Sequence, residues 1–168
     1  MGEVPPVDHI DAGLDRLRAL IALFDPIAHQ AKARPICWIS DGNDAGTDYC
    51  PDCARWKAKH IRRHNKACRE AVADGGWDTY RESDQTAFCG GCGHLLGYSL
   101  SRYALRDEIE YWDDDAWVEA LTPIHAYQIR AVLYAAWVFR DFIGTAVAIG
   151  ERAVSLLPPL PTAEAAHA

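Results

Sequence analysis

Apolar side chains at helical spacing predict helices at the start of the chain. The pattern runs through Leu14, Leu17, Ile21 and Phe24 and predicts an amphipathic helix over about residues 11–24. The dipeptide Asp25-Pro26 follows, and an acidic residue before a proline is typical of a helix start. We therefore expect a second, short helix that ends near residue 33.

Helical spacing returns after residue 100. Ser101 is a good N-cap for a helix whose apolar face carries Leu105, Ile109 and Trp112. The triplet Asp113-Asp114-Asp115 can cap another helix, which we expect to be short and to cover residues 116–121. The sequence thus predicts two helices before the next proline.

Thr122-Pro123 predicts the start of a long helix that continues to about Val154. This segment is apolar on nearly all sides, and its charged residues Arg130, Asp141 and Arg152 are spaced to share one stripe. Such a helix is buried, and we expect it to pack against the N-terminal helix; the alternative is a homodimer through helix 123–154. Its uncharged runs of about nine residues are shorter than the roughly 20 residues that span a membrane, so we expect no membrane association.

The middle of the chain mixes strand and turn signals. Ile36-Cys37-Trp38-Ile39 is a short β-prone run, and residues 40–46 have the composition of a turn. Residues 54–72 lack glycine and proline and predict a helix, whereas residues 77–85 are predicted to be a polar connection. We expect a further strand over residues 94–100.

Two C-x-x-C pairs give the strongest chemical signal in the chain: Cys50, Cys53, Cys89 and Cys92. Four thiolates brought together by two tight turns form the tetrahedral ligand set that Zn²⁺ prefers, and cysteines this close in sequence make poor disulfide loops. The spacing therefore predicts one structural zinc site. A rubredoxin-like iron site uses the same ligands, so the spacing does not distinguish zinc from iron.

Further potential ligands lie near these pairs. Cys37 precedes the first pair, and His60, His64 and Cys68 are four residues apart, so they would share one helix face. These four residues are candidate ligands of a second, open metal site, and His94 directly after the second pair is another candidate ligand. The simpler alternative is that the extra cysteines are small buried residues and that the histidines are surface or core-edge side chains.

Charge is distributed unevenly along a chain of 168 residues whose net charge is −7. Seven basic residues lie in the predicted helix 54–72: Arg55, Lys57, Lys59, Arg62, Arg63, Lys66 and Arg69. Five of these, Arg55, Lys59, Arg62, Lys66 and Arg69, follow helical pitch and would form one stripe. An acidic run over residues 107–119 has the same count, so this stripe could face nucleic acid, another protein or the acidic run itself.

These elements together predict an α+β fold that is mostly helical. In this fold a zinc-ribbon-like β-hairpin module is clasped by N- and C-terminal helices. We expect N-terminal helices over residues 1–33, a zinc-knuckle module with an inserted basic helix over 34–100, C-terminal helices over 101–157 and a flexible tail over 158–168.

Three functions are compatible with the sequence. The one it favours is a zinc-stabilised adaptor or inhibitor of bacterial type that acts by protein–protein interaction through charged surfaces. The second is a nucleic-acid-binding regulator that uses Arg55, Lys59, Arg62, Arg63, Lys66 and Arg69. The third is a metalloenzyme with an additional open metal site; the sequence has no Walker loop, nucleophile elbow or His-Glu-x-x-His motif, so it favours a non-enzymatic function over this one without excluding an enzyme.

The same sequence predicts a cytoplasmic protein. Six cysteines are best kept reduced in that compartment, and residues 1–11 lack the basic and apolar regions of an export signal.

Overall fold

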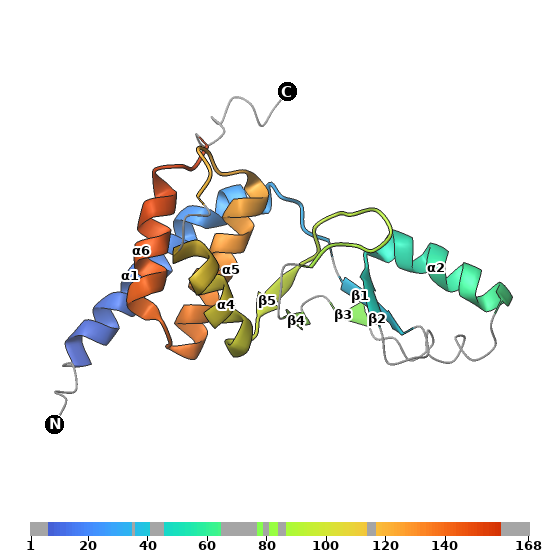
Figure 1. The fold of residues 1–168 in the computed structure, drawn as a ribbon, viewed down its shortest axis with the longest axis horizontal. Helices are drawn as coiled ribbons and strands as arrows, with labels where there is room; N and C mark the ends of the chain where they lie inside the picture. The colour runs from blue at the N-terminus through green and yellow to red at the C-terminus, as the bar shows by residue number, and fades with distance from the viewer. Residues whose placement is uncertain are drawn as a thin grey trace. The chain divides into compact units, whose positions relative to one another are not determined.

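The computed structural model describes residues 7–34, 36–40, 46–64, 77–78, 81–83, 87–113 and 117–158. These residues form five helices and several short strands, which confirms that the protein is mostly helical (Figure 1). The chain divides into two compact units. A helical unit comprises Met1–Ala31 and Leu100–Ala168, and a cysteine-containing unit comprises Lys32–Ser99.

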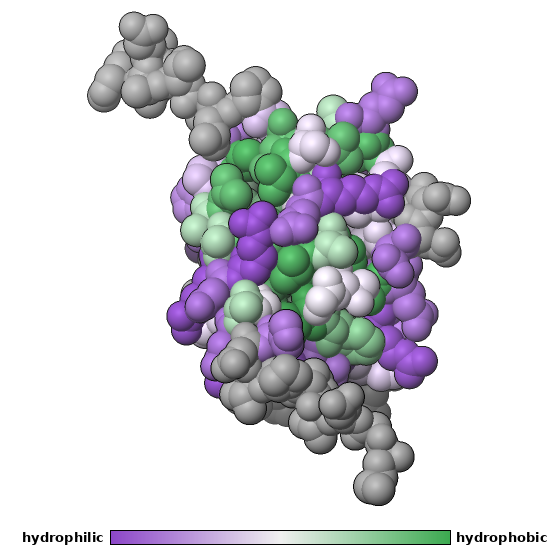
Figure 2. Space-filling model, turned by 90° about the vertical axis from the view of Figure 1, so that its left-hand side faces the viewer, coloured by the Kyte–Doolittle hydropathy of each residue, from purple (hydrophilic) through white to green (hydrophobic). Residues whose placement is uncertain are grey.

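The helical unit is built from α1 (Val7–His29), α4 (Arg102–Asp113), α5 (Pro123–Phe139) and α6 (Ile143–Val154). Helix α1 packs along α5 and α6, which confirms the predicted packing of N-terminal on C-terminal helices (Figure 1). The buried side chains between them are large and apolar: Leu17, Leu20, Phe24, Ile129, Leu133 and Ile149. On the face of this unit shown in Figure 2, apolar and polar residues are interleaved.

Helix α1 is continuous, so the prediction of two helices that meet at Asp25-Pro26 is wrong. Pro26 lies inside α1, although a proline in a helix interior removes a hydrogen bond and costs about 3 kcal/mol. Packing on both sides of it offsets this cost, because Phe24 and Ile27 are almost fully buried (0 % and 1 % exposed). Asp25 also forms an ion pair with Arg130 of α5.

The predicted long helix 123–154 is also wrong, because the chain breaks between α5 and α6. Arg140 (φ 53°, ψ 39°) and Phe142 (φ 53°, ψ 26°) adopt left-handed conformations that end one helix and begin the next. The start of α5 is as predicted. Thr122 Oγ1 accepts a hydrogen bond from the His125 N–H (3.2 Å), and His125 Nδ1 accepts one from the Thr122 N–H (3.2 Å).

The break separates the three charged residues that were expected to share a stripe. Arg130 pairs with Asp25, and Asp141 pairs with Arg102 at 3.0 Å. The Arg152 guanidinium lies 4.5 Å from the ring centroid of Trp117. Each charge is therefore matched by a different element of the helical unit.

The segment before α5 differs in part from its prediction. Ser101 caps α4 as expected, since its Oγ accepts a hydrogen bond from the Ala104 N–H at 3.1 Å. The short helix predicted over 116–121 is wrong, because residues 117–122 are not helical. The Leu121 N–H instead donates to the Leu156 carbonyl at 2.9 Å, which holds this stretch against the end of α6.

The cysteine-containing unit has a small antiparallel sheet in the order β2-β1-β3. Strand β1 (Ile36–Ser40) was predicted, whereas β2 (Gly46–Tyr49) was not. Strands β3 (Trp77–Asp78) and β4 (Arg81–Ser83) lie in the stretch that was wrongly expected to be a polar connection. Strand β4 pairs with β5 (Tyr98–Leu100), which covers only the end of the strand expected over 94–100.

Helix α2 (Pro51–His64) follows β2 directly. It begins three residues earlier than the helix predicted over 54–72, which places Cys53 in its first turn. The predicted part beyond residue 64 lies outside the described residues. In the described part of the chain, every helix is too short or too polar to cross a bilayer.

Packing of α6 against α1 and α5 requires a residue without a side chain at position 150. A Cβ atom there would lie 2.9 Å from Leu20 Cδ1 and 3.0 Å from Leu133 Cδ2. We expect Gly150→Leu to lower the free energy of unfolding by at least about 2 kcal/mol through overpacking. Gly144→Leu is the matched control, because a Cβ on Gly144 in the same helix would have no atom within 4 Å, and leucine favours helix. Equal denaturation midpoints for the two variants would contradict this account.

Candidate metal centre

Three chain segments bring the four predicted cysteines together. Cys50 follows β2, and Cys53 lies one turn later in α2. Cys89 and Cys92 lie in a turn whose ends are joined by the antiparallel bridge between Phe88 and Leu95. The second pair thus has the predicted turn, whereas the first pair lies at the start of a helix.

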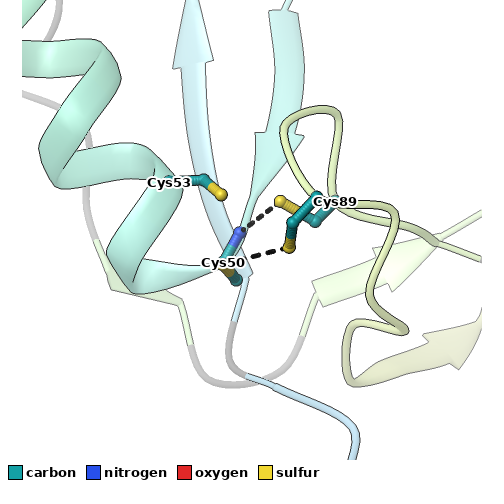
Figure 3. Close-up of side chains that lie close together, drawn as sticks. Cys50, Cys53 and Cys89 are labelled. Atoms are coloured by element: carbon teal, nitrogen blue, oxygen red, sulfur yellow. Dashed lines mark hydrogen bonds between the residues drawn. The ribbon is translucent and has the colours of Figure 1, made fainter.

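The four sulfur atoms converge on one point. They all lie within 4.8 Å of one another, and the Cys50 and Cys92 sulfurs are 3.8 Å apart. Figure 3 shows Cys53 in the first turn of α2, Cys50 just before that helix and Cys89 in the turn, with the three residues close together. Zinc–sulfur bonds of about 2.3 Å set the edge of a tetrahedron at about 3.8 Å. The cluster therefore fits a metal ion, and a disulfide would need sulfur atoms about 2 Å apart.

Backbone N–H groups stabilise negative charge on Cys89. This side chain is buried, and its sulfur accepts hydrogen bonds from the Cys50 N–H (3.2 Å) and the Gly91 N–H (3.4 Å). Burial alone would raise the pKa of the Cys89 thiol, but the N–H donors outweigh burial and lower that pKa to about 6. Cys89 is consequently the thiol of this cluster best prepared to act as a thiolate ligand.

The two thiols of the first cysteine pair differ in pKa. Burial opposes ionisation of Cys50, yet the Cys53 backbone N–H and the neighbouring side chains lower its pKa overall. The hydrogen bond to Cys50 instead raises the pKa of Cys53 to about 12, because this thiol acts as the donor. Cys53 would lose its proton when a metal ion binds, as ligand thiols do.

Arg34 is a neighbour of the cluster that the spacing of cysteines does not reveal. Its Nη1 lies 3.7 Å from the Cys50 sulfur and 3.3 Å from the Asp52 carboxylate, and its contact with Cys50 raises the pKa of the guanidinium. The Arg34 backbone is held by hydrogen bonds with Leu95 and Gly97 (2.9 and 2.7 Å). A four-thiolate zinc centre carries a net charge of −2, which a neighbouring guanidinium offsets.

Glycines allow the second cysteine turn to approach the first pair. A Cβ on Gly91 would lie 2.8 Å from the Cys53 sulfur, and a Cβ on Gly90 would lie 2.5 Å from Thr47 Cγ2. The Gly90 N–H donates to the Asp48 carbonyl at 2.9 Å, which joins the turn to β2. Gly91 therefore allows the turn to approach Cys53, and Gly90 allows it to approach Thr47 in β2.

The structure leaves the predicted second metal site untested. Cys37 lies in β1, and His60 and His64 lie in α2, but their side chains, like all of Cys68, are outside the described residues. Among the described side chains, the four cysteines form the single potential metal-binding group, and His94 is outside it. The His94 carbonyl accepts a hydrogen bond from the Cys89 N–H at 2.8 Å, so its backbone shapes the turn.

The basic residues are described only at the start of α2. Arg55 is exposed and donates to the Asp52 carboxylate at 2.6 Å, an exposed pair of the kind that contributes little stability. The side chains of Lys59, Arg62 and Arg63 in α2 are outside the described residues, as are Lys66 and Arg69 entirely. The expected stripe of basic side chains thus remains a prediction.

The close approach of Gly91 to Cys53 leads to a specific prediction. We expect Gly91→Ala to lower metal content and the thermal midpoint, because its methyl group would displace the Cys53 sulfur. Gly93→Asn is the matched control: Gly93 has φ +70° and open space where a Cβ would lie, and asparagine tolerates this conformation. Metal content measured by elemental analysis should fall in the first variant only; full occupancy in Gly91→Ala would show that the contact is unimportant.

Comparisons with protein-family models, with curated proteins and with solved structures find no match for this chain. The interpretation of the four-cysteine cluster therefore depends on its own geometry and chemistry.

Proposed function

We propose that this protein is a zinc-stabilised adaptor or inhibitor that acts by contact with another protein. The observation that supports this proposal is the closed four-cysteine cluster, in which the four sulfurs lie within 4.8 Å of one another. Four thiolates complete the tetrahedral coordination of zinc and leave no position for a substrate, as in structural rather than catalytic sites. The metal would hold the fold of the cysteine-containing unit, and binding would take place on its surface.

Zinc is the metal that we assign to this centre. Tetrahedral four-thiolate coordination suits both zinc and iron, so the assignment rests on the structural role of the site. Arg34 and the N–H groups of Cys50 and Gly91 are the groups that would surround the thiolates. The module is zinc-ribbon-like at Cys89–Cys92, where a turn between paired residues supplies two ligands, and departs from a ribbon at Cys53, which lies in a helix.

We assign partner binding to the basic part of α2, residues 54–64. Residues 54–64 of this helix contain five basic residues and no acidic residue: Arg55, Lys57, Lys59, Arg62 and Arg63. A metal ion bound by Cys53 in the first turn of this helix and by Cys50 just before it would fix the direction in which the helix runs. This charge also suits the alternative function of nucleic-acid binding, which is favoured by exposed Trp56 between Arg55 and Lys57.

Metal content tests the four-cysteine centre. We expect protein purified without added metal to contain one zinc ion per chain, and Cys53→Ala and Cys89→Ala to yield little soluble protein. Structural zinc contributes on the order of 10 kcal/mol to the folding of small zinc modules. Elemental analysis and thermal denaturation measure both effects. Unchanged thermal midpoints for either alanine variant would overturn the metal centre, and two zinc ions per chain would restore the enzyme alternative.

Charge reversal in α2 tests binding of the partner protein. We expect the tagged protein to capture a partner from a lysate of its native host, and the purified partner to form a complex with it at fixed stoichiometry. The double reversal Arg62→Glu/Arg63→Glu should abolish this complex while preserving zinc content. The control Arg16→Glu/Arg106→Glu makes the same charge change at exposed positions of the helical unit and should have no effect. A complex that nuclease treatment destroys would favour nucleic-acid binding instead.

A further inference from the structure

A groove adjoins the metal centre in the cysteine-containing unit. It has a volume of about 400 Å³ and is lined by Tyr49, Asp52, Cys53, Trp56, Lys57, Gly90 and Gly91. This volume is sufficient for a large side chain and falls in the range of ligand-binding pockets. We call it the Trp56 groove.

The Trp56 groove has the composition of a protein-binding hot spot. Trp56 is 66 % exposed although it is one of the largest apolar side chains in the chain. Tryptophan and tyrosine, here with Tyr49, are the residues that most often dominate protein–protein binding energy. Gly90 and Gly91 have no side chains, so their peptide groups form part of the lining.

Positive charge lies beside the groove and continues along α2. Lys57 lines the groove, and the Asp52 carboxylate there is paired with Arg34 (3.3 Å) and Arg55 (2.6 Å). From Lys57 to His64 the helix has only basic charged residues. A ligand that fits both parts would place an apolar group in the groove and negative charges along α2.

We propose that the Trp56 groove binds a short peptide segment of the partner protein, in which an apolar or aromatic residue is flanked on one side by Asp or Glu residues. This inference rests on the proposed adaptor function and specifies the chemistry of the partner. The apolar residue packs against Trp56 and Tyr49, and the acidic residues follow α2. The helix rises about 12 Å from Trp56 to His64, and about four residues of an extended peptide have the same length.

The net charge of the protein favours a peptide over a single-stranded nucleic acid. The chain carries a net charge of −7, which repels a polymer that has a phosphate on every nucleotide. A short peptide brings only the few negative charges that Lys57 and the other basic residues of α2 match.

The test uses the full-length zinc-loaded protein and a phage library of random dodecapeptides. We expect selection to enrich peptides with an apolar or aromatic residue next to several Asp or Glu residues. The best peptide, synthesised with a fluorescein label, should bind in fluorescence anisotropy, and Trp56→Ala should weaken its affinity at least tenfold. Lys57→Glu should also weaken binding, whereas Trp56→Phe should retain most of it.

Controls separate the groove from general effects. Tyr103→Ala removes another exposed aromatic side chain (73 % exposed), located on α4 of the helical unit, and should bind the peptide normally. Each variant should contain one zinc ion per chain, which shows that the metal centre is intact. A twelve-nucleotide oligothymidylate is the comparison ligand; tighter binding of it than of any peptide, with loss in Trp56→Ala, would overturn the peptide proposal.

Two other results would also overturn the peptide proposal. One is failure of the selection to enrich any peptide with an apolar residue next to acidic residues, and the other is equal peptide affinity of Trp56→Ala and the parent protein. Failure of this proposal is distinguishable from failure of the adaptor function. If the purified partner still binds Trp56→Ala but not Arg62→Glu/Arg63→Glu, the adaptor function stands and the groove is not its site. If the protein captures no partner at all, the adaptor function falls as well.

Discussion

The cysteine-containing unit depends on the convergence of its four sulfurs. Cys50 and Cys89 are 39 residues apart in the chain, and a single hydrogen bond from backbone N–H to sulfur already joins them. The turn that contains Cys89 and Cys92 is held to β2 by the hydrogen bond from the Gly90 N–H to the Asp48 carbonyl. The sheet β2-β1-β3 consists of strands of two to five residues, so the hydrogen bonds between these strands add little stability. Coordination of a metal ion by these sulfurs would let such short elements form a defined unit.

The helical unit is stabilised by a different kind of interaction. Its core is a continuous set of apolar side chains from α1, α5 and α6, and Gly150 lets these helices approach closely. Ion pairs such as Arg102–Asp141 lie at its exposed surface, where they orient side chains more than they stabilise the fold. Buried apolar area stabilises the helical unit, whereas the cysteine-containing unit would be stabilised by a metal ion bound to its four sulfurs.

The sequence predicted the features that depend on residues close together in the chain. These are the cysteine spacing, the caps at Ser101 and Thr122 and the apolar face of α1. The break at Arg140–Phe142 has no glycine or proline to signal it, and Pro26 signals a break that tertiary packing overrides. Arg34 could not be assigned to the metal centre, because its approach to Cys50 depends on backbone pairing with Leu95 and Gly97.

The position of Cys53 in the first turn of α2 has a consequence for helix formation. Helices of 14 residues are marginal on their own, because closing the first turn costs several dihedral angles for one hydrogen bond. Among the α2 side chains that the structure describes, Ala54 is the only one fully enclosed by protein, so packing contributes little there. A metal ion held by Cys50 and Cys53 would close that turn in advance. The ion would thereby act as the nucleus from which the helix propagates, and its departure would return α2 to a helix–coil equilibrium.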